Sequence, residues 1–319
     1  MTRKLSVLIL ILMSAILADA QVVRPPVPRP SQKATIAQTI GTTEVAITYS
    51  RPAVKGRPIF GDPPAAMAAR AKGEATLDDQ NQRQKGEPIV PWDHVWRAGA
   101  NEATLFTVND DILVNGQLLP AGKYSMHMIP AKDGNWTVIF NKDDGQWGSF
   151  TYDAAKDALR VKTKAETAPL NMELLTYYFD PVGDTSATVN LRWEKMHVPF
   201  TVEVKDVVGS TMARLRAYVA AAKADDPAPY ANAANYAKSV KLNDDANKWF
   251  EEALKRTDAQ IAAKETYQNL ARRSNILFQL GRTQDSLAAA ERAVVVGKAA
   301  KVDTASMEKR IADLKAGKQ

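Results

Sequence analysis

The densest group of polar and aromatic side chains in the sequence lies in residues 91–104. These residues read P-W-D-H-V-W-R-A-G-A-N-E-A-T and include two tryptophans, a histidine, an arginine, an asparagine and two acids. On a loop, Trp96 would form a stacking platform beside Arg97, Asn101 and Glu102, which suits a sugar or another small polar ligand. The alternative is structural: the tryptophans would anchor the core, and Arg97 and Glu102 would form a buried ion pair.

His127 offers a second kind of chemistry. It lies in the segment Y-S-M-H-M-I, where strand alternation places Ser125, His127 and Ile129 on one face. If that face met Glu102 and His94, two histidines and a carboxylate could hold zinc or act as an acid–base pair in hydrolysis. Nothing in the spacing brings these three candidates together, so no catalytic residue, metal ligand or cofactor is assigned.

Composition excludes several other chemistries. The chain has 319 residues, a formal net charge of +6, three histidines and no cysteine. Without cysteine it has no disulfide bond, thiolate zinc site, iron–sulfur cluster or cysteine nucleophile. No G-x-S-x-G, H-E-x-x-H or EF-hand sequence is present. The lysines and arginines are scattered, as on a solvated surface, so no nucleic-acid partner is expected.

The first residues have the pattern of an export signal. Arg3 and Lys4 precede a run of apolar and small residues, 5–17, which is followed by A-D-A. This predicts a signal peptide over residues 1–20, because the run is too short for a membrane-spanning helix. After cleavage we expect no integral membrane segment and a periplasmic or extracellular location. Residues 21–32 are rich in proline and predict an extended linker.

Residues 33–205 have the periodicity of β-strands. Apolar and polar residues alternate over 45–49 and again over 187–193. Turn dipeptides that supply the positive φ of a tight hairpin occur at Asn115-Gly116, Asp133-Gly134 and Asp144-Gly145. We therefore expect an antiparallel β-sandwich or a jelly-roll-like domain, with residues 62–87 as a surface insertion.

In residues 206–319 the apolar spacing changes to that of helices. The first helix is expected where Val208, Met212, Leu215, Val219 and Ala222 form an apolar stripe. Further helices are expected at about 228–241, 244–256, 264–280, 284–297 and 304–316. Two of them share a pattern: Ala246, Phe250, Ala253 and Leu254 correspond to Ser286, Ala290, Ala293 and Val294, 40 residues later. This predicts a tetratricopeptide-like array that binds another protein, or alternatively a plain helical bundle. The complete chain is thus expected to be α+β.

Distinctive short stretches are spread over residues 31–205. They include Y-S-R-P (49–52), V-K-G-R (54–57), I-F-G (59–61), V-W-R-A-G-A-N-E-A-T (95–104), A-G-K-Y-S (121–125) and W-T-V-I-F-N-K (136–142). In these stretches the chain resembles a family of bacterial secreted proteins catalogued as domain of unknown function 2911. The resemblance implies export and a β-rich domain, and it transfers no catalytic residue because the family has no assigned activity.

The polar positions in these stretches, with His127, are the candidates for ligand binding. They are Arg51, Lys55, Arg57, Trp96, Arg97, Asn101, Glu102 and His127. The main hypothesis is an exported, non-enzymatic module that binds a small polar or glycan ligand and carries a helical protein-interaction tail. One alternative is a hydrolase with a Glu/His pair, with or without a metal. The other is a purely structural envelope protein, with Arg51, Arg57, Arg97 and Glu102 in a buried charge network.

Overall fold

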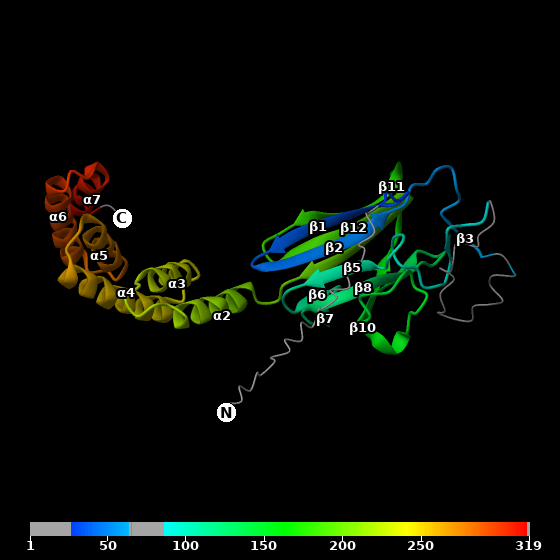
Figure 1. Ribbon diagram of the computed structural model, residues 1–319, viewed down its shortest axis with the longest axis horizontal. Helices are drawn as coiled ribbons and strands as arrows, with labels where there is room; N and C mark the ends of the chain where they lie inside the picture. The colour runs from blue at the N-terminus through cyan, green and yellow to red at the C-terminus, as the bar shows by residue number, and fades with distance from the viewer. Residues whose placement is uncertain (1–26, 64, 66–85, 318–319) are drawn as a thin grey trace, which may run out of the picture.

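The computed structural model describes residues 27–63, 65 and 86–317. The predicted signal peptide and most of the predicted insertion at 62–87 lie outside the described residues. The described chain comprises a β-rich part followed by helices, which extend from one end of it (Figure 1).

The larger sheet has six strands, and each pair of neighbours is antiparallel. In spatial order the strands are β1 (Gln32–Ile40), β2 (Thr43–Arg51), β5 (Thr104–Val108), β8 (Gly122–Ile129), β9 (Asn135–Asn141) and β10 (Asp157–Lys164). The second sheet has four strands: β11 (Glu166–Val182), β12 (Ser186–Glu203), β6 (Ile112–Val114) and β7 (Gln117–Leu119). A short parallel pair, β3 (Phe60–Gly61) and β4 (Val90–Pro91), completes the β-structure.

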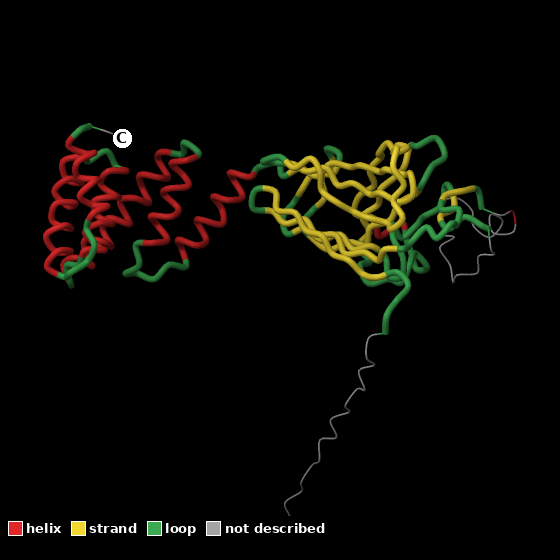
Figure 2. The backbone as a smooth tube through the Cα atoms, turned by 90° about the horizontal axis from the view of Figure 1, so that it is seen from above, coloured by secondary structure: helices red, strands yellow, loops and turns green. Residues whose placement is uncertain are grey.

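The two larger sheets form a sandwich with one shared hydrophobic core (Figure 2). Val45 and Ile47 of β2 are fully buried, as the alternation predicts, and so are Leu191 and Trp193 of β12. Because these inward residues come from both sheets, the core lies between them. The expected α+β class with an antiparallel β-rich first part is confirmed.

Two of the three turn dipeptides take the predicted backbone conformation. Asn115 and Gly116 have φ values of 44° and 79° and join β6 to β7 as a two-residue hairpin. Gly134 has φ 82° just before β9. The prediction at Gly145 is wrong, because this glycine does not take a positive φ. The chain from β9 to β10 is a long connection over residues 142–156, whose last three residues form the 3₁₀ turn η1 (Ala154–Lys156).

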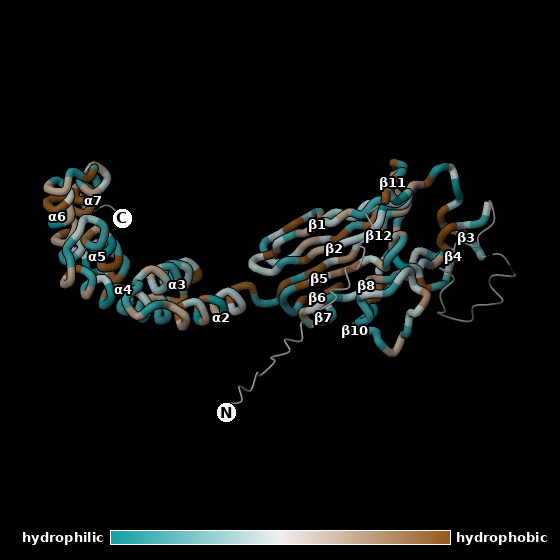
Figure 3. Tube along the Cα trace, in the orientation of Figure 1, coloured by the Kyte–Doolittle hydropathy of each residue, from teal (hydrophilic) through white to brown (hydrophobic). Residues whose placement is uncertain are grey.

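Six helices follow the sandwich in the described chain. They are α2 (Val207–Ala220), α3 (Ala228–Ser239), α4 (Asn243–Ala263), α5 (Tyr267–Gln279), α6 (Thr283–Ala299) and α7 (Ala305–Lys315). Consecutive helices pack on each other, and the corresponding positions 40 residues apart have similar burial. Hydrophobic and hydrophilic positions are interleaved along these helices (Figure 3). None of the described helices combines the length and the apolar character that a membrane crossing requires.

The turns after α3, α5 and α6 end these helices in the same way. Lys241, Gly281 and Lys301 have φ values of 64°, 75° and 58°. In each turn the next residue donates its backbone N–H to the carbonyl five residues earlier, as Leu242 does to Ala237 at 2.8 Å. This is the Schellman cap, in which glycine is the favoured left-handed residue because it has no Cβ.

The caps give a matched pair of stability predictions. A Cβ at Gly281 would meet no atom within 4 Å, so Gly281→Ala should lose only the conformational term, about 1 kcal/mol. Lys241→Gly should gain about 0.5–1 kcal/mol because it relieves the same strain. Urea unfolding followed by circular dichroism would measure both changes in the free energy of unfolding. If the two variants changed it in the same direction, the assignment of these turns as Schellman caps would be wrong.

Candidate functional site

Residues 92–103, between β4 and β5, form the loop that contains the polar motif. The Trp96 backbone pairs with Met128 of β8 through bonds of 2.8 and 2.9 Å. The Trp96 ring is 3% exposed and stacks on Trp193 with centroids 6.0 Å apart. The predicted stacking platform at Trp96 is therefore not available to a ligand: backbone pairing turns this ring into the core, where it acts as an anchor.

The turn after Trp96 is tight and strained. Ala98 and Asn101 have φ values of 51° and 61°, which side chains other than glycine rarely adopt. The Ala98 carbonyl accepts the hydroxyls of Thr104, at 2.9 Å, and Tyr177, at 2.8 Å. A Cβ at Gly99 would lie 2.7 Å from Thr104 Oγ1. The small residues of the motif thus allow this close approach.

The connection between β9 and β10 folds back onto this turn. The Ala103 N–H donates to the Gln146 carbonyl at 3.1 Å, and the Gly148 N–H donates to the Asn101 carbonyl at 3.0 Å. Arg97 Nη1 donates to the same Asn101 carbonyl at 2.6 Å. Residues 146–148 and the motif therefore form one unit, although the sequence separates them by more than 40 residues.

Beneath this connection, Ser125 and His127 lie on the outer face of the six-stranded sheet. Ser125 Oγ and His127 Nε2 are 2.9 Å apart, and both residues are fully buried. Gln146 Nε2 lies 3.4 Å from the Ser125 hydroxyl. His127 Nδ1 and Gln146 Oε1 are buried and have no hydrogen-bond partner among the described residues. In this conformation His127 cannot reach a substrate, so the geometry does not favour a Glu/His hydrolase.

Burial lowers the pKa of the His127 side chain to about 4. A charged imidazole would lose its hydration here, and the nearby Arg97 adds repulsion, whereas Asp157 and Asp143 partly oppose the shift. Because the neutral form is favoured in the folded state, this histidine is neutral at physiological pH.

On the solvent side of the same unit, Glu102 and Trp147 are paired across an isolated antiparallel bridge. Trp147 is 50% exposed. Glu102 Oε1 lies 2.6 Å from Arg29 Nη1, and the Arg29 guanidinium carbon lies 5.8 Å from the Trp147 ring centroid. The Arg97 guanidinium likewise lies over the ring of Phe150, which is 38% exposed. We call Glu102 and Trp147 the acidic–aromatic cradle.

Arg29 and a backbone hydrogen bond both lower the pKa of Glu102. Partial burial alone would raise this pKa, but the hydrogen bond from Arg29, the backbone hydrogen bond and the charges of Arg29 and Lys33 outweigh it. The pKa of Glu102 is consequently lower than usual, and its carboxylate is ionised at neutral pH.

The candidates from the distinctive stretches at 49–52 and 54–57 lie elsewhere and contact other groups. Arg51 donates to the Leu175 carbonyl and the Thr176 hydroxyl of β11. The Lys55 backbone N–H donates to Glu173, and Arg57 donates to the carbonyls of Val54 and Ala53. The predicted network of Arg51, Arg57, Arg97 and Glu102 is therefore not formed, because Glu102 pairs with Arg29 and the first two arginines pair with backbone carbonyls.

The weak metal candidates His94, Glu102 and His127 do not form a cluster. Within the described ranges, no group of three or more His, Cys, Asp or Glu residues is placed to hold a metal ion. His127 already bonds Ser125, and Glu102 already pairs with Arg29. The acidic–aromatic cradle, not a metal centre, is the arrangement that the motif produces.

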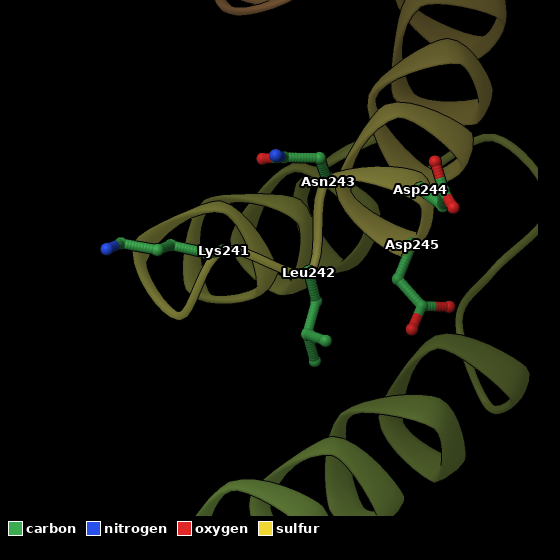
Figure 4. Close-up of a pocket in the computed structure, with 5 residues that line it drawn as sticks. All are labelled: Lys241, Leu242, Asn243, Asp244 and Asp245. Atoms are coloured by element: carbon green, nitrogen blue, oxygen red, sulfur yellow. The ribbon is translucent and has the colours of Figure 1, made fainter.

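A concave surface lies in the helical region, at the turn between α3 and α4 (Figure 4). This depression of about 400 Å³ is lined by residues 241–245. Asp245 there also pairs with Arg216 of α2 at 3.2 Å. None of the predicted site residues lies in it.

Sequence reasoning missed Trp147 and Gln146, which complete the unit around Asn101. The available signal was D-G-Q-W-G at 144–148, a large aromatic residue inside a turn sequence. This signal marks Trp147 as a residue of a turn but does not say whether its ring is exposed, because Trp96 also lies in a loop and is buried. Asp144-Gly145 had drawn attention to this stretch as a hairpin only.

The fold and this unit define an α+β protein whose β-sandwich presents a loop-built polar and aromatic surface. The chain belongs to the protein family of unknown function DUF2911, whose profile matches residues 31–202. The match covers the sandwich up to the end of β12 and stops before α2. No curated protein and no solved structure matches the chain.

The depressed pKa of His127 predicts a specific loss of stability in acid. Between the unfolded pKa near 6.5 and the folded pKa near 4, the unfolded chain binds more protons, so stability falls as pH falls. From pH 7.5 to pH 4.5, wild type should lose about 2–3 kcal/mol more than His127→Gln, which has no ring to protonate. Urea unfolding at both pH values would measure this difference. Parallel pH profiles for the two proteins would disprove it.

A second stability prediction separates the cradle from a buried network. The side chains of Arg29 and Glu102 are 48% and 40% exposed, and such pairs contribute below about 1 kcal/mol. Glu102→Ala should therefore shift the unfolding free energy by less than this amount. A loss of about 3–5 kcal/mol in thermal or urea unfolding would instead indicate a buried ion pair.

Proposed function

We propose that this protein is an exported, non-enzymatic binding module for a small polar or glycan ligand. The observation that supports this most is the acidic–aromatic cradle. Trp147 leaves half of its surface exposed beside an ionised carboxylate, on a backbone held by several hydrogen bonds. An aromatic face with adjacent polar groups is a common way to orient a polar ligand.

The rigidity of the surrounding loops supports the same proposal. The Asn101 carbonyl joins the motif to Gly148, and the Ala103 N–H bonds Gln146. Gly148 has φ 63°, and a Cβ there would lie 2.7 Å from the Arg97 guanidinium carbon. A surface fixed in this way needs little ordering when a ligand binds, which favours affinity.

Export is part of the proposal and rests on the sequence. Residues 1–20 have the basic start, apolar run and A-D-A site of a signal peptide. We infer a periplasmic or extracellular location. The absence of cysteine is compatible with it, because the fold does not depend on disulfide bonds.

We further propose that the helical region is a tetratricopeptide-like surface for another protein. Helices α3 to α6 pack as two successive hairpins whose matching positions are 40 residues apart. The length of this period exceeds the 34 residues of the standard repeat, so the array is a variant of it. Val295 of α6 and Tyr218 of α2 are 58% and 49% exposed.

The binding proposal predicts that Trp147→Ala loses ligand without losing the fold. Stacking on an aromatic ring contributes about 0.5–1.5 kcal/mol, so affinity should fall about two- to tenfold. Stability should change by about 0.5 kcal/mol or less, because the ring is half-exposed. Tyr218→Ala is the matched control, since Tyr218 is an equally exposed aromatic residue on α2.

The experiment is a screen of residues 21–319 on an array of neutral and charged oligosaccharides and amino-acid amides. Affinities of the hits are then measured by calorimetry for wild type, Trp147→Ala and Tyr218→Ala. The variant Arg29→Ala uncovers the cradle and is screened beside wild type. If neither protein binds any compound on the array, the proposed binding function is wrong. Equal affinity of the two aromatic variants would place the site elsewhere.

A further inference from the structure

We infer that the acidic–aromatic cradle is specific for a cationic group, a guanidinium or an alkylammonium, and that Arg29 occupies it as a tethered ligand. This inference rests on the proposed function and names its ligand class. Arg29 Nη1 lies 2.6 Å from Glu102 Oε1, and its guanidinium carbon lies 5.8 Å from the Trp147 ring centroid. A carboxylate and an aromatic face therefore contact the same cation, which is a recognised mode of cation binding.

The carboxylate has capacity that Arg29 does not use. Glu102 Oε2 is buried and has no hydrogen-bond partner among the described residues. A planar guanidinium can donate to both oxygens of a carboxylate at once, which is stronger than a single bond. Arg29 bonds one of the two oxygens, so the bidentate pairing that a guanidinium can make with a carboxylate is not formed.

The cradle favours a cation over an anion or a neutral group. Its one ionised side chain is Glu102, and the electron-rich face of Trp147 also attracts positive charge. Arg97, the other nearby cation, is mostly buried and held by the Asn101 carbonyl and the Phe150 ring. Lys33 acts on Glu102 from a distance and does not hydrogen-bond it. Removal of Arg29 thus leaves Glu102 without its ion-pair partner, beside an open aromatic face.

The described part of the proline-rich linker before β1, residues 27–31, is called the leader here and holds Arg29 at the cradle. Asn101 Nδ2 donates to the Ser31 carbonyl at 3.0 Å, which anchors the chain two residues from Arg29. Arg29 lies between Pro28 and Pro30, which restrict the backbone to extended conformations. Since the anchor does not involve the guanidinium, the Arg29 side chain can leave the cradle while the leader stays in place.

Tethering sets the strength of the competition. A group on a short tether has an effective concentration of about millimolar at its site, so a free cation must overcome that concentration. Because both partners of the tethered pair are partly exposed, the pair is weak, and removal of the tethered guanidinium should strengthen binding of the free cation by up to about fivefold. Salt should weaken the interaction, because both partners are partly exposed.

The test uses calorimetric titration of residues 21–319 with Nα-acetyl-arginine amide and with its uncharged analogue, Nα-acetyl-citrulline amide. We expect Arg29→Ala to bind the arginine probe about three- to fivefold more tightly than wild type and to discriminate against the citrulline probe. Adding Glu102→Gln or Trp147→Ala to Arg29→Ala should abolish most of this binding. Arg216→Ala is the matched control, because it removes another exposed, ion-paired arginine, on α2.

The outcomes separate this inference from the proposed function. If Arg29→Ala binds an oligosaccharide on the array but not the arginine probe, the cation specificity is wrong and the binding function stands. If it binds neither, both are wrong. If wild type and Arg29→Ala bind the arginine probe equally, Arg29 is not a competitor. Thermal unfolding of each variant verifies that the fold is retained.

Discussion

The backbone carbonyl of Asn101 is the point on which the whole site unit depends. It accepts the Gly148 N–H at 3.0 Å and Arg97 Nη1 at 2.6 Å, and so joins the motif, the connection after β9 and a charged side chain. Asn101 can present this carbonyl because its φ is 61°, in the left-handed region where asparagine is tolerated better than most residues. Without that turn, neither the buried polar residues beneath nor the exposed pair above would have a fixed place.

A charged motif can thus serve folding and still leave a functional surface. Irregular loops leave carbonyl groups without strand or helix partners, and buried carbonyls must be satisfied. Arg57 and Arg97 donate to such carbonyls, and Arg51 donates to the Leu175 carbonyl of β11. Glu102 differs from these arginines because its partner is the side chain of Arg29. This side chain can move away while the leader stays in place.

Local patterns in the sequence predicted what depends on local geometry. Alternation at 45–49 and the Asn115-Gly116 hairpin were correct because strand faces and two-residue turns are determined by adjacent residues. The roles of Trp96 and Trp147 were not predictable in this way. Trp96 is turned inward by pairing with Met128, and Trp147 is placed beside Glu102 by a bridge across 45 residues. No local period encodes such contacts, so the identity of the exposed tryptophan required the structure.

The geometry of β1 separates the cradle from the helices. The leader enters β1 at Gln32, next to the cradle, whereas the other end of the strand turns at Gly41, where a Cβ would meet Val207 at the start of α2. Arg214 of α2 pairs with Asp110 at 2.5 Å, and Asp110 also accepts the hydroxyl of Thr43.

Nine strand residues span about 30 Å, so the cradle and the start of α2 lie at opposite ends of β1. Coupling between the two would have to pass along β1 and β2, whose register is paired without interruption from Gln32 to Ile40. A strand pair held this regularly has no second arrangement to adopt. The two surfaces proposed above would therefore act independently, because no element shown to have two arrangements links them.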